Sequence, residues 1–170
     1  QEPEELKEDG MALAEGDVIA MGVMPDVPEG VQLDIEDNAL DGWTCHYDEG
    51  YGHATELRHL ESIPASATEV FIGARNPEGK ITVGAFGERD EVLKHTPVDE
   101  PHEHNGVWWY LTDDYSFGFA PNSSITQNAA DASHRDDPKR LSWHLDDSTG
   151  WRAGANEMPN SNWRKLVYWR

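Results

Sequence analysis

Short runs rich in Val, Ile, Phe, Trp and Tyr recur along most of this chain at intervals of about ten residues, with turn-forming residues between them. Runs of this length and spacing are typical of antiparallel β-sheet proteins. The alternation of strands and helices that a doubly wound fold requires is missing. We therefore predict an all-β fold, a single antiparallel β-sandwich or barrel-like domain of about 8–10 short strands over residues 31–170.

One link between two of these runs identifies a hairpin. Residues 69–75 and 80–86 are joined by Asn-Pro-Glu-Gly at 76–79, and Pro and Gly in such a link favour a tight turn. Residues 54–60 are the one helical turn expected in the domain, because Leu57 and Leu60 share a face there. Further strands are expected at 43–47, 107–112, 116–120, 140–145, 151–153 and 165–169.

Residues 1–30 precede this domain as an acidic N-terminal arm. The first 50 residues hold 15 Asp or Glu and a single Lys. Within the arm, residues 17–24 resemble a strand, which Pro25 and Pro28 end. The arm is either a solvated acidic tail or a strand donated to the sheet edge of a neighbouring copy.

The charge of the chain limits its partners. The 170 residues include 13 Lys or Arg against 33 Asp or Glu, a formal net charge of −20. A field of that sign repels nucleic-acid phosphates and anionic lipid headgroups. The longest apolar stretch, residues 18–23, is far shorter than a bilayer span. We therefore expect no nucleic-acid binding and no membrane insertion, which leaves a glycan or other neutral ligand, cations, or further copies of the chain in a homo-oligomer.

The same acidity has a second explanation. A surface rich in Asp and Glu with only five Lys in the chain is also typical of salt-adapted proteins. In that case the net charge reflects the solvent and carries no information about partners.

Two features favour an exported protein. Gln1 is a residue that signal cleavage often leaves at an N-terminus. Asn122-Ser123-Ser124 is an N-glycosylation sequon in a turn-like stretch. We expect a secreted, extracellular glycoprotein. Its single cysteine, Cys45, excludes an intramolecular disulfide scaffold, so packing must stabilise the fold.

Seven tryptophans are more than the centre of a domain of this size would hold. We expect Trp43, Trp109 and Trp143 in the core. Strand alternation places Trp109 on the face opposite Trp108 and Tyr110.

Trp151 and Trp163 are the tryptophans expected at the surface. Their neighbours include Gly150, Gly154 and Asn160, turn formers that leave an indole uncovered. An exposed indole presents a flat face that can stack on a sugar ring or a planar ligand. The sequence therefore predicts a ligand surface composed of Trp151, Arg152, Asn162 and Trp163.

Two sets of residues are candidates for metal binding. If their segment is extended, His102 and His104 share one face, as a half-site for a transition metal would require. Pairs of acids in turns between strands supply the oxygen ligands that calcium prefers. The calcium candidates are Asp113, Asp114, Asp146 and Asp147.

No catalytic motif supports an enzyme assignment: the nucleophile elbow, the P-loop, the dinucleotide fingerprint and the Cys-x-x-Cys motif are all absent. Our leading hypothesis is a secreted, non-enzymatic module that binds a glycan or other neutral ligand through exposed Trp, with calcium as a possible structural ion. One alternative is a self-assembling extracellular structural protein that uses the N-terminal arm. Another is a hydrolase or metal-dependent enzyme that uses His102 and His104.

Overall fold

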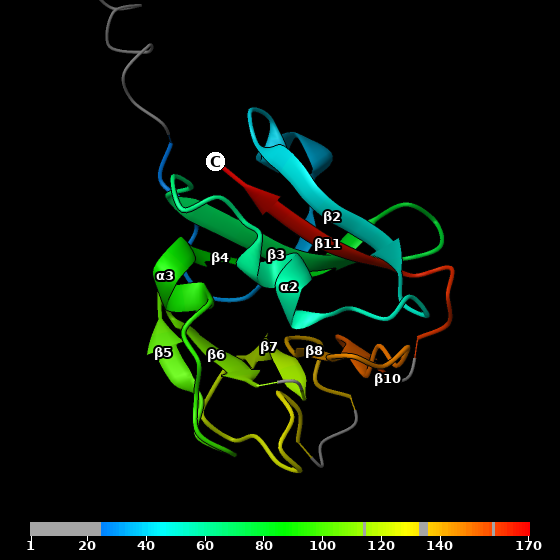
Figure 1. The fold of residues 1–170 in the computed structure, drawn as a ribbon. Helices are drawn as coiled ribbons and strands as arrows, with labels where there is room; N and C mark the ends of the chain where they lie inside the picture. Colours follow the sequence, from blue (N-terminus) through cyan, green and yellow to red (C-terminus); the bar gives the residue numbers. More distant parts are fainter. Residues whose placement is uncertain (1–24, 114, 133–135, 158) are drawn as a thin grey trace, which may run out of the picture.

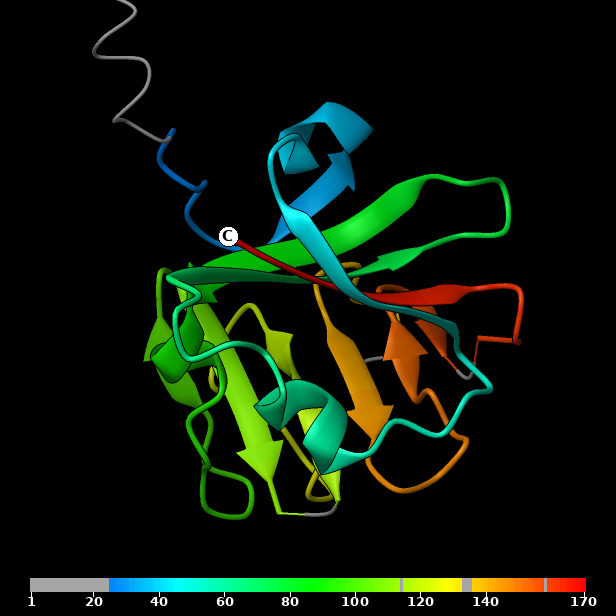
Figure 2. The same cartoon turned by 45° about the horizontal axis from the view of Figure 1, so that its top comes forward.

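The computed structural model describes residues 25–113, 115–132, 136–157 and 159–170, and these residues form two antiparallel sheets (Figures 1 and 2). The five-stranded sheet has the order β1 (Gln32–Ile35), β4 (Ile81–Glu88), β3 (Glu69–Arg75), β11 (Arg164–Trp169) and β2 (Thr44–Gly50). The six-stranded sheet has the order β10 (Asn156–Glu157), β9 (Arg152–Ala153), β8 (Leu141–His144), β7 (Ser116–Ala120), β6 (Val107–Thr112) and β5 (His102–His104).

These sheets confirm the predicted all-β antiparallel fold. They remain two separate sheets with open edges, so the domain is a sandwich and does not close into a barrel. The hairpin predicted at 76–79 joins β3 to β4, and Gly79 has the positive φ of 89° that its turn requires.

One hydrophobic core lies between the sheets. Alternation along β6 buries Trp109 in this core and turns Tyr110 to the opposite face, as expected. Fully burying a large apolar side chain contributes about 1.5–3 kcal/mol. The main contributors from the two sheets are Val70, Ile72, Val167, Trp109, Phe117 and Trp143.

Three strands and two helical segments were not anticipated. Strands β1, β5 and β10 are short and lack the apolar runs by which the other strands are recognised. The helix α2 (Leu57–Glu61) agrees with the predicted turn, but it is not the only helix. A 3-10 helix at Asp37–Leu40 and α3 (Arg89–Val92) correct that expectation, and each is a single turn that buries one apolar residue, Leu40 or Val92.

The strand predicted at 17–24 lies outside the described residues. From Pro25 onward the chain is packed: Val27 contacts a second hydrophobic cluster on the outer side of the five-stranded sheet. The Pro25 carbonyl accepts a hydrogen bond from Arg170 at 2.5 Å. Trp43, expected in the central core, is instead partly buried against this second cluster. Within the described residues no helix is long and apolar enough to cross a membrane.

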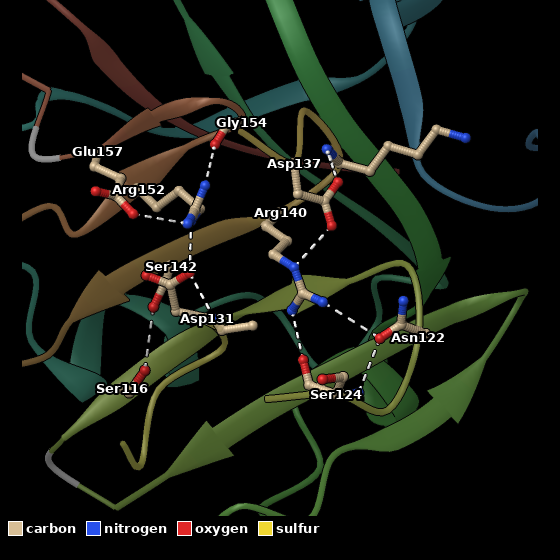
Figure 3. A network of polar contacts seen from close by, with 12 residues as sticks. Ser116, Asn122, Ser124, Asp131, Asp137, Arg140, Ser142, Arg152, Gly154 and Glu157 are labelled. Atoms are coloured by element: carbon tan, nitrogen blue, oxygen red, sulfur yellow. Dashed lines mark hydrogen bonds and ion pairs between the residues drawn. The ribbon is translucent and has the colours of Figure 1, made fainter. Parts of the chain in front are cut away.

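The face of the six-stranded sheet that is turned away from the core is its outer face, and residues 121–132 contribute to its cover. Two buried arginines hold this region in place (Figure 3). Arg140 donates to Asp137 Oδ2 at 2.8 Å and to the Ser124 carbonyl at 2.7 Å. Arg152 donates to Asp131 Oδ1 at 2.6 Å. We call this region the arginine half of the outer face; it comprises Arg140, Arg152, Asp131 and Asp137.

Candidate functional site

Three aromatic rings form a row at the other end of the outer face. The Tyr115 and His144 ring centroids are 4.9 Å apart. His144 in turn stacks on Trp151, with centroids 4.6 Å apart and ring planes 14° from parallel. Tyr115 is 40% exposed, and the other two rings are partly buried. We call this region the turn end, since it surrounds the β6–β7 turn; it comprises Thr112, Asp113, Tyr115, His144 and Trp151.

Strand register explains how these residues meet. Thr112 pairs with Ser116, and Ser116 pairs with His144. Directly paired residues of neighbouring strands project to the same side of a sheet. Their neighbours Phe117 and Trp143 point into the core, so Thr112, Ser116 and His144 lie in a row across three strands on the outer face.

The imidazole of His144 is neutral, and one of its nitrogens has no partner among the described residues. Burial lowers the pKa of His144, so its imidazole is neutral at physiological pH. The His144 Nε2 atom is buried and makes no hydrogen bond within the described residues. Nearby, the Thr149 hydroxyl and amide donate to Asp147 Oδ1 at 3.0 Å each, and these hydrogen bonds lower the pKa of Asp147.

A cavity of about 440 Å³ adjoins the β6–β7 turn, and none of the three aromatic rings lines it. Thr112 and Asp113 belong to both the turn end and the lining of this cavity. Asp113 pairs through Oδ1 with His95 Nδ1, and His95 Nε2 lies 3.7 Å from Glu61. The complete lining is His95, Thr96, Pro97, Val98, Thr112, Asp113 and Asn128.

The four residues predicted as one ligand surface are not brought together. Trp151 lies at the turn end, whereas Trp163 packs against the main core. Asn162 is exposed in a turn, where its amide donates to Asn160 Oδ1 at 2.9 Å.

Arg152 differs most from its predicted position. Its side chain is 0% exposed, and its guanidinium donates to Asp131, to the Gly154 carbonyl and to Glu157 (Figure 3). The sequence expectation that Arg152 faces a ligand is therefore corrected: Arg152 is a buried structural cation. Arg152 pairs in register with Ser142 of β8, which lies on the outer face. Arg152 therefore points to the same face, where the covering segment of residues 121–132 buries it.

The predicted calcium ligands are dispersed. Asp113 lines the cavity beside His95, and Asp114 lies outside the described residues. Asp146 is exposed with a positive φ of 63°, and Asp147 is occupied by Thr149. Within residues 25–113, 115–132, 136–157 and 159–170, no group of three or more His, Cys, Asp or Glu is arranged to hold a metal ion.

The remaining predicted residues have protein partners. His102 Nε2 lies 2.6 Å from Glu91 Oε1. His104 Nε2 accepts the Glu88 amide hydrogen at 3.0 Å. Asn122 is exposed, and its Oδ1 accepts the Ser124 amide hydrogen at 2.9 Å.

A buried lysine was not anticipated. Lys165 on β11 is 0% exposed and donates to the His53 carbonyl at 2.8 Å and to Thr55 Oγ1 at 2.9 Å. Its ammonium lies 5.8 Å from the ring centroids of both Tyr51 and Trp143. Desolvation lowers the pKa of Lys165 to about 8. Along a strand, residues two positions apart face the same side. Lys165 is two residues before the apolar Val167, and this spacing is the one feature of the sequence that points to its burial.

Sequence reasoning also missed Thr112, Tyr115 and His144. Each is an ordinary strand or turn residue in the sequence, and they are separated from one another by up to 32 positions, 144 − 112. No local pattern predicts their contact.

Comparison with known proteins adds no further assignment: the chain matches no protein-family model, no curated protein and no solved structure.

Proposed function

We propose that this protein is a non-enzymatic binding module for a neutral, hydroxyl-rich ligand, a glycan, and that the ligand stacks on the aromatic row of the turn end. The observation that carries the proposal is the row itself: Tyr115, His144 and Trp151 in consecutive ring contact at the rim of the sandwich. The apolar face of a sugar ring fits such flat surfaces, and the indole N–H and phenol hydroxyl supply hydrogen bonds at their edges.

Trp151 and Trp163 illustrate why the turn end is favoured. Trp163 packs against the main core, so its contribution to packing is a sufficient reason for a tryptophan at this position. Trp151 instead stacks on a histidine whose imidazole nitrogen is unpaired within the described residues. Core packing does not require Trp, His and Tyr rings to contact one another at the rim of the sandwich. A surface on which a ligand stacks would explain this arrangement.

Charge supports a neutral ligand over an anionic one. The chain carries a net charge of −20, and Asp113, Asp146 and Asp147 adjoin the aromatic row along the chain. A neutral His144 adds no positive charge to offset them. An anionic polymer would be repelled on approach, whereas carboxylates accept hydrogen bonds from sugar hydroxyls.

The experiment is calorimetric titration of the full chain with neutral hexasaccharides of glucose, mannose, xylose and N-acetylglucosamine. We expect at least one to bind, and Trp151→Ala to weaken that binding about tenfold, the equivalent of 1.4 kcal/mol of lost stacking. Trp163→Phe is the matched control: it changes a tryptophan of the main core and leaves the affinity unchanged. Failure of every hexasaccharide to bind, or equal binding by the native and Trp151→Ala proteins, would disprove the proposal.

Secretion, glycosylation at Asn122 and stabilisation by calcium belong to this proposal. The exposed position of Asn122 supports the second of these. Expression in a eukaryotic secretory host tests the glycosylation: we expect a mass decrease on glycosidase treatment for the native chain and none for Asn122→Gln.

Calcium at millimolar concentration should raise the melting temperature more than sodium at equal ionic strength.

Self-assembly through the N-terminal arm is the second candidate. Strand β2 pairs with β11 on one side and is an edge strand of the five-stranded sheet. Pro25 and Trp43, the residue just before β2, line the same groove, so the described part of the arm begins near the start of this edge strand. Met21→Pro should convert an assembled protein to monomers by light scattering, because proline removes a ladder hydrogen bond. A monomeric native protein would exclude this candidate.

A further inference from the structure

We propose that the cavity beside Thr112 is a binding site for a single sugar unit that presents adjacent hydroxyl groups, and that Thr112, Asp113 and Asn128 recognise those hydroxyls. This inference deepens the function proposed above and rests on it, but it concerns the cavity and not the aromatic row. The cavity and the aromatic row adjoin the same turn, in which the Tyr115 amide donates to the Thr112 carbonyl at 3.3 Å.

The buried hydroxyl of Thr112 is the first reason. Thr112 is only 6% exposed, yet its Oγ1 makes no hydrogen bond within the described residues. The hydroxyl of Tyr110 is nearby, and burial raises the pKa of that phenol while Thr112 lowers it, but the two hydroxyls do not meet hydrogen-bond geometry. The Tyr110 hydroxyl donates to Asn128 Oδ1 and accepts the Asp99 amide hydrogen. A buried hydroxyl without a partner destabilises the fold. A ligand hydroxyl in the cavity would supply the missing partner.

The backbone around the cavity is the second reason. Asp99, Gln127 and Asn128 all have positive φ values, of 59°, 60° and 53°. Residues other than glycine occupy this region at a cost, and such residues concentrate at ligand sites. Asp99 Oδ1 accepts the Asn128 amide hydrogen at 2.7 Å, so the side chain of one strained residue fixes the backbone of another. The strained loop therefore presents Asn128 to the cavity in a defined orientation.

The polar groups of the lining suit a diol. The Asn128 amide oxygen is used by Tyr110, which leaves its NH₂ group as a donor toward a ligand. The Asp113 carboxylate is 76% exposed and has lone pairs beyond the one that faces His95. Thr112 both donates and accepts. A carboxylate acceptor, an amide donor and a hydroxyl together match two neighbouring sugar hydroxyls, and Pro97 and Val98 supply an apolar wall for the ring carbons.

The test is a titration of the ¹⁵N-labelled full chain with methyl glycosides of glucose, galactose, mannose and N-acetylglucosamine at millimolar concentrations. We expect one or more of them to shift the side-chain NH₂ signals of Asn128 and the amide signals of residues 112–113. Thr112→Val should weaken that binding at least tenfold and leave the melting temperature unchanged or raised, because an unpartnered buried hydroxyl is replaced by a methyl group.

Thr82→Val is the matched control. Thr82 Oγ1 is also buried without a partner, but Thr82 lies on β4 of the other sheet. This variant should change stability as Thr112→Val does and bind the glycosides like the native protein. Asp113→Asn provides a second variant at an exposed position, where the fold is not at risk, and we expect it to weaken binding severalfold.

The outcomes separate the two proposals. If no methyl glycoside shifts the signals of the cavity residues, or if Thr112→Val binds as the native protein does, the cavity proposal is wrong. If Trp151→Ala still weakens hexasaccharide binding in that case, the aromatic row remains the site. Loss of glycoside binding in Thr112→Val but not in Trp151→Ala supports a cavity site with its own affinity.

Discussion

The two halves of the outer face of the six-stranded sheet differ in whether their buried polar groups have hydrogen-bond partners. In the arginine half, Arg140 and Arg152 are each surrounded by carboxylate and carbonyl acceptors (Figure 3). At the turn end, Thr112 Oγ1 and His144 Nε2 are buried and unpaired among the described residues. Both halves lie on the same face of the same sheet. Satisfied polar groups stabilise the sandwich, whereas unsatisfied ones cost stability unless a further partner, such as the ligand proposed above, binds them.

The largest effect is expected from breaking the arginine half. Arg152→Leu leaves the carboxylates of Asp131 and Glu157 without the cation between them. We expect a loss of about 3–5 kcal/mol in the free energy of unfolding, measured by chemical denaturation, because removing one partner of a buried ion pair leaves an uncompensated charge. A loss below about 1 kcal/mol would show that the two halves do not differ in this way.

Lys165 is a buried cation on the core side of the five-stranded sheet, and its contribution to stability should depend on pH. The folded-state pKa is lowered to about 8, so between that pH and about 10.4 the unfolded chain binds the proton that the folded chain has released. The native protein should therefore become more stable relative to Lys165→Met as pH rises, by about 1–2 kcal/mol between pH ~7 and ~9.5. Chemical denaturation of both proteins at the two pH values measures this difference. A constant difference would mean that Lys165 titrates normally.

Tyr51→Phe provides a direct contrast to Thr112→Val. The Tyr51 hydroxyl accepts the Trp143 indole hydrogen at 3.0 Å and donates to the Arg152 carbonyl at 3.2 Å. Its removal leaves a buried indole N–H unpaired, and we expect a cost of about 1–3 kcal/mol in thermal or chemical unfolding. If Tyr51→Phe were as harmless as Thr112→Val, hydrogen-bond satisfaction would not explain the difference between a paired and an unpaired buried hydroxyl.

The smallest effect is expected at a surface ion pair. Arg164 donates to Asp48 Oδ1 at 2.8 Å, with both side chains well exposed. Arg164→Ala should cost less than about 1 kcal/mol, and added salt should shrink that cost, because solvent and ions screen such pairs. A cost equal to that of Arg152→Leu would remove burial as the reason for the arginine effect.

Much of the fold could be predicted because its signals are local. The hairpin at 76–79, the extent of β3 and the burial of Trp109 and Trp143 follow from turn residues and from alternation along a strand. Strand β5 could not be predicted, because His102–His104 has no apolar run and exists only through its pairing with β6. Of the predicted ligand surface, only Trp151 lies at the turn end, since exposure of an indole depends on what packs over it.

An antiparallel all-β fold, the tight hairpin and the strongly negative charge could all be read from the sequence, since side-chain alternation, turn chemistry and charge are properties of neighbouring residues. The folded arrangement of the strands is what buries Arg152 under the segment that covers the outer face. The same arrangement brings His144, on the adjacent strand, into ring contact with Trp151 and Tyr115 at the rim. The physical reason is that burial and hydrogen-bond partners come from strands and loops distant in the chain. Whether a polar group is satisfied therefore depends on which segments the fold places beside it.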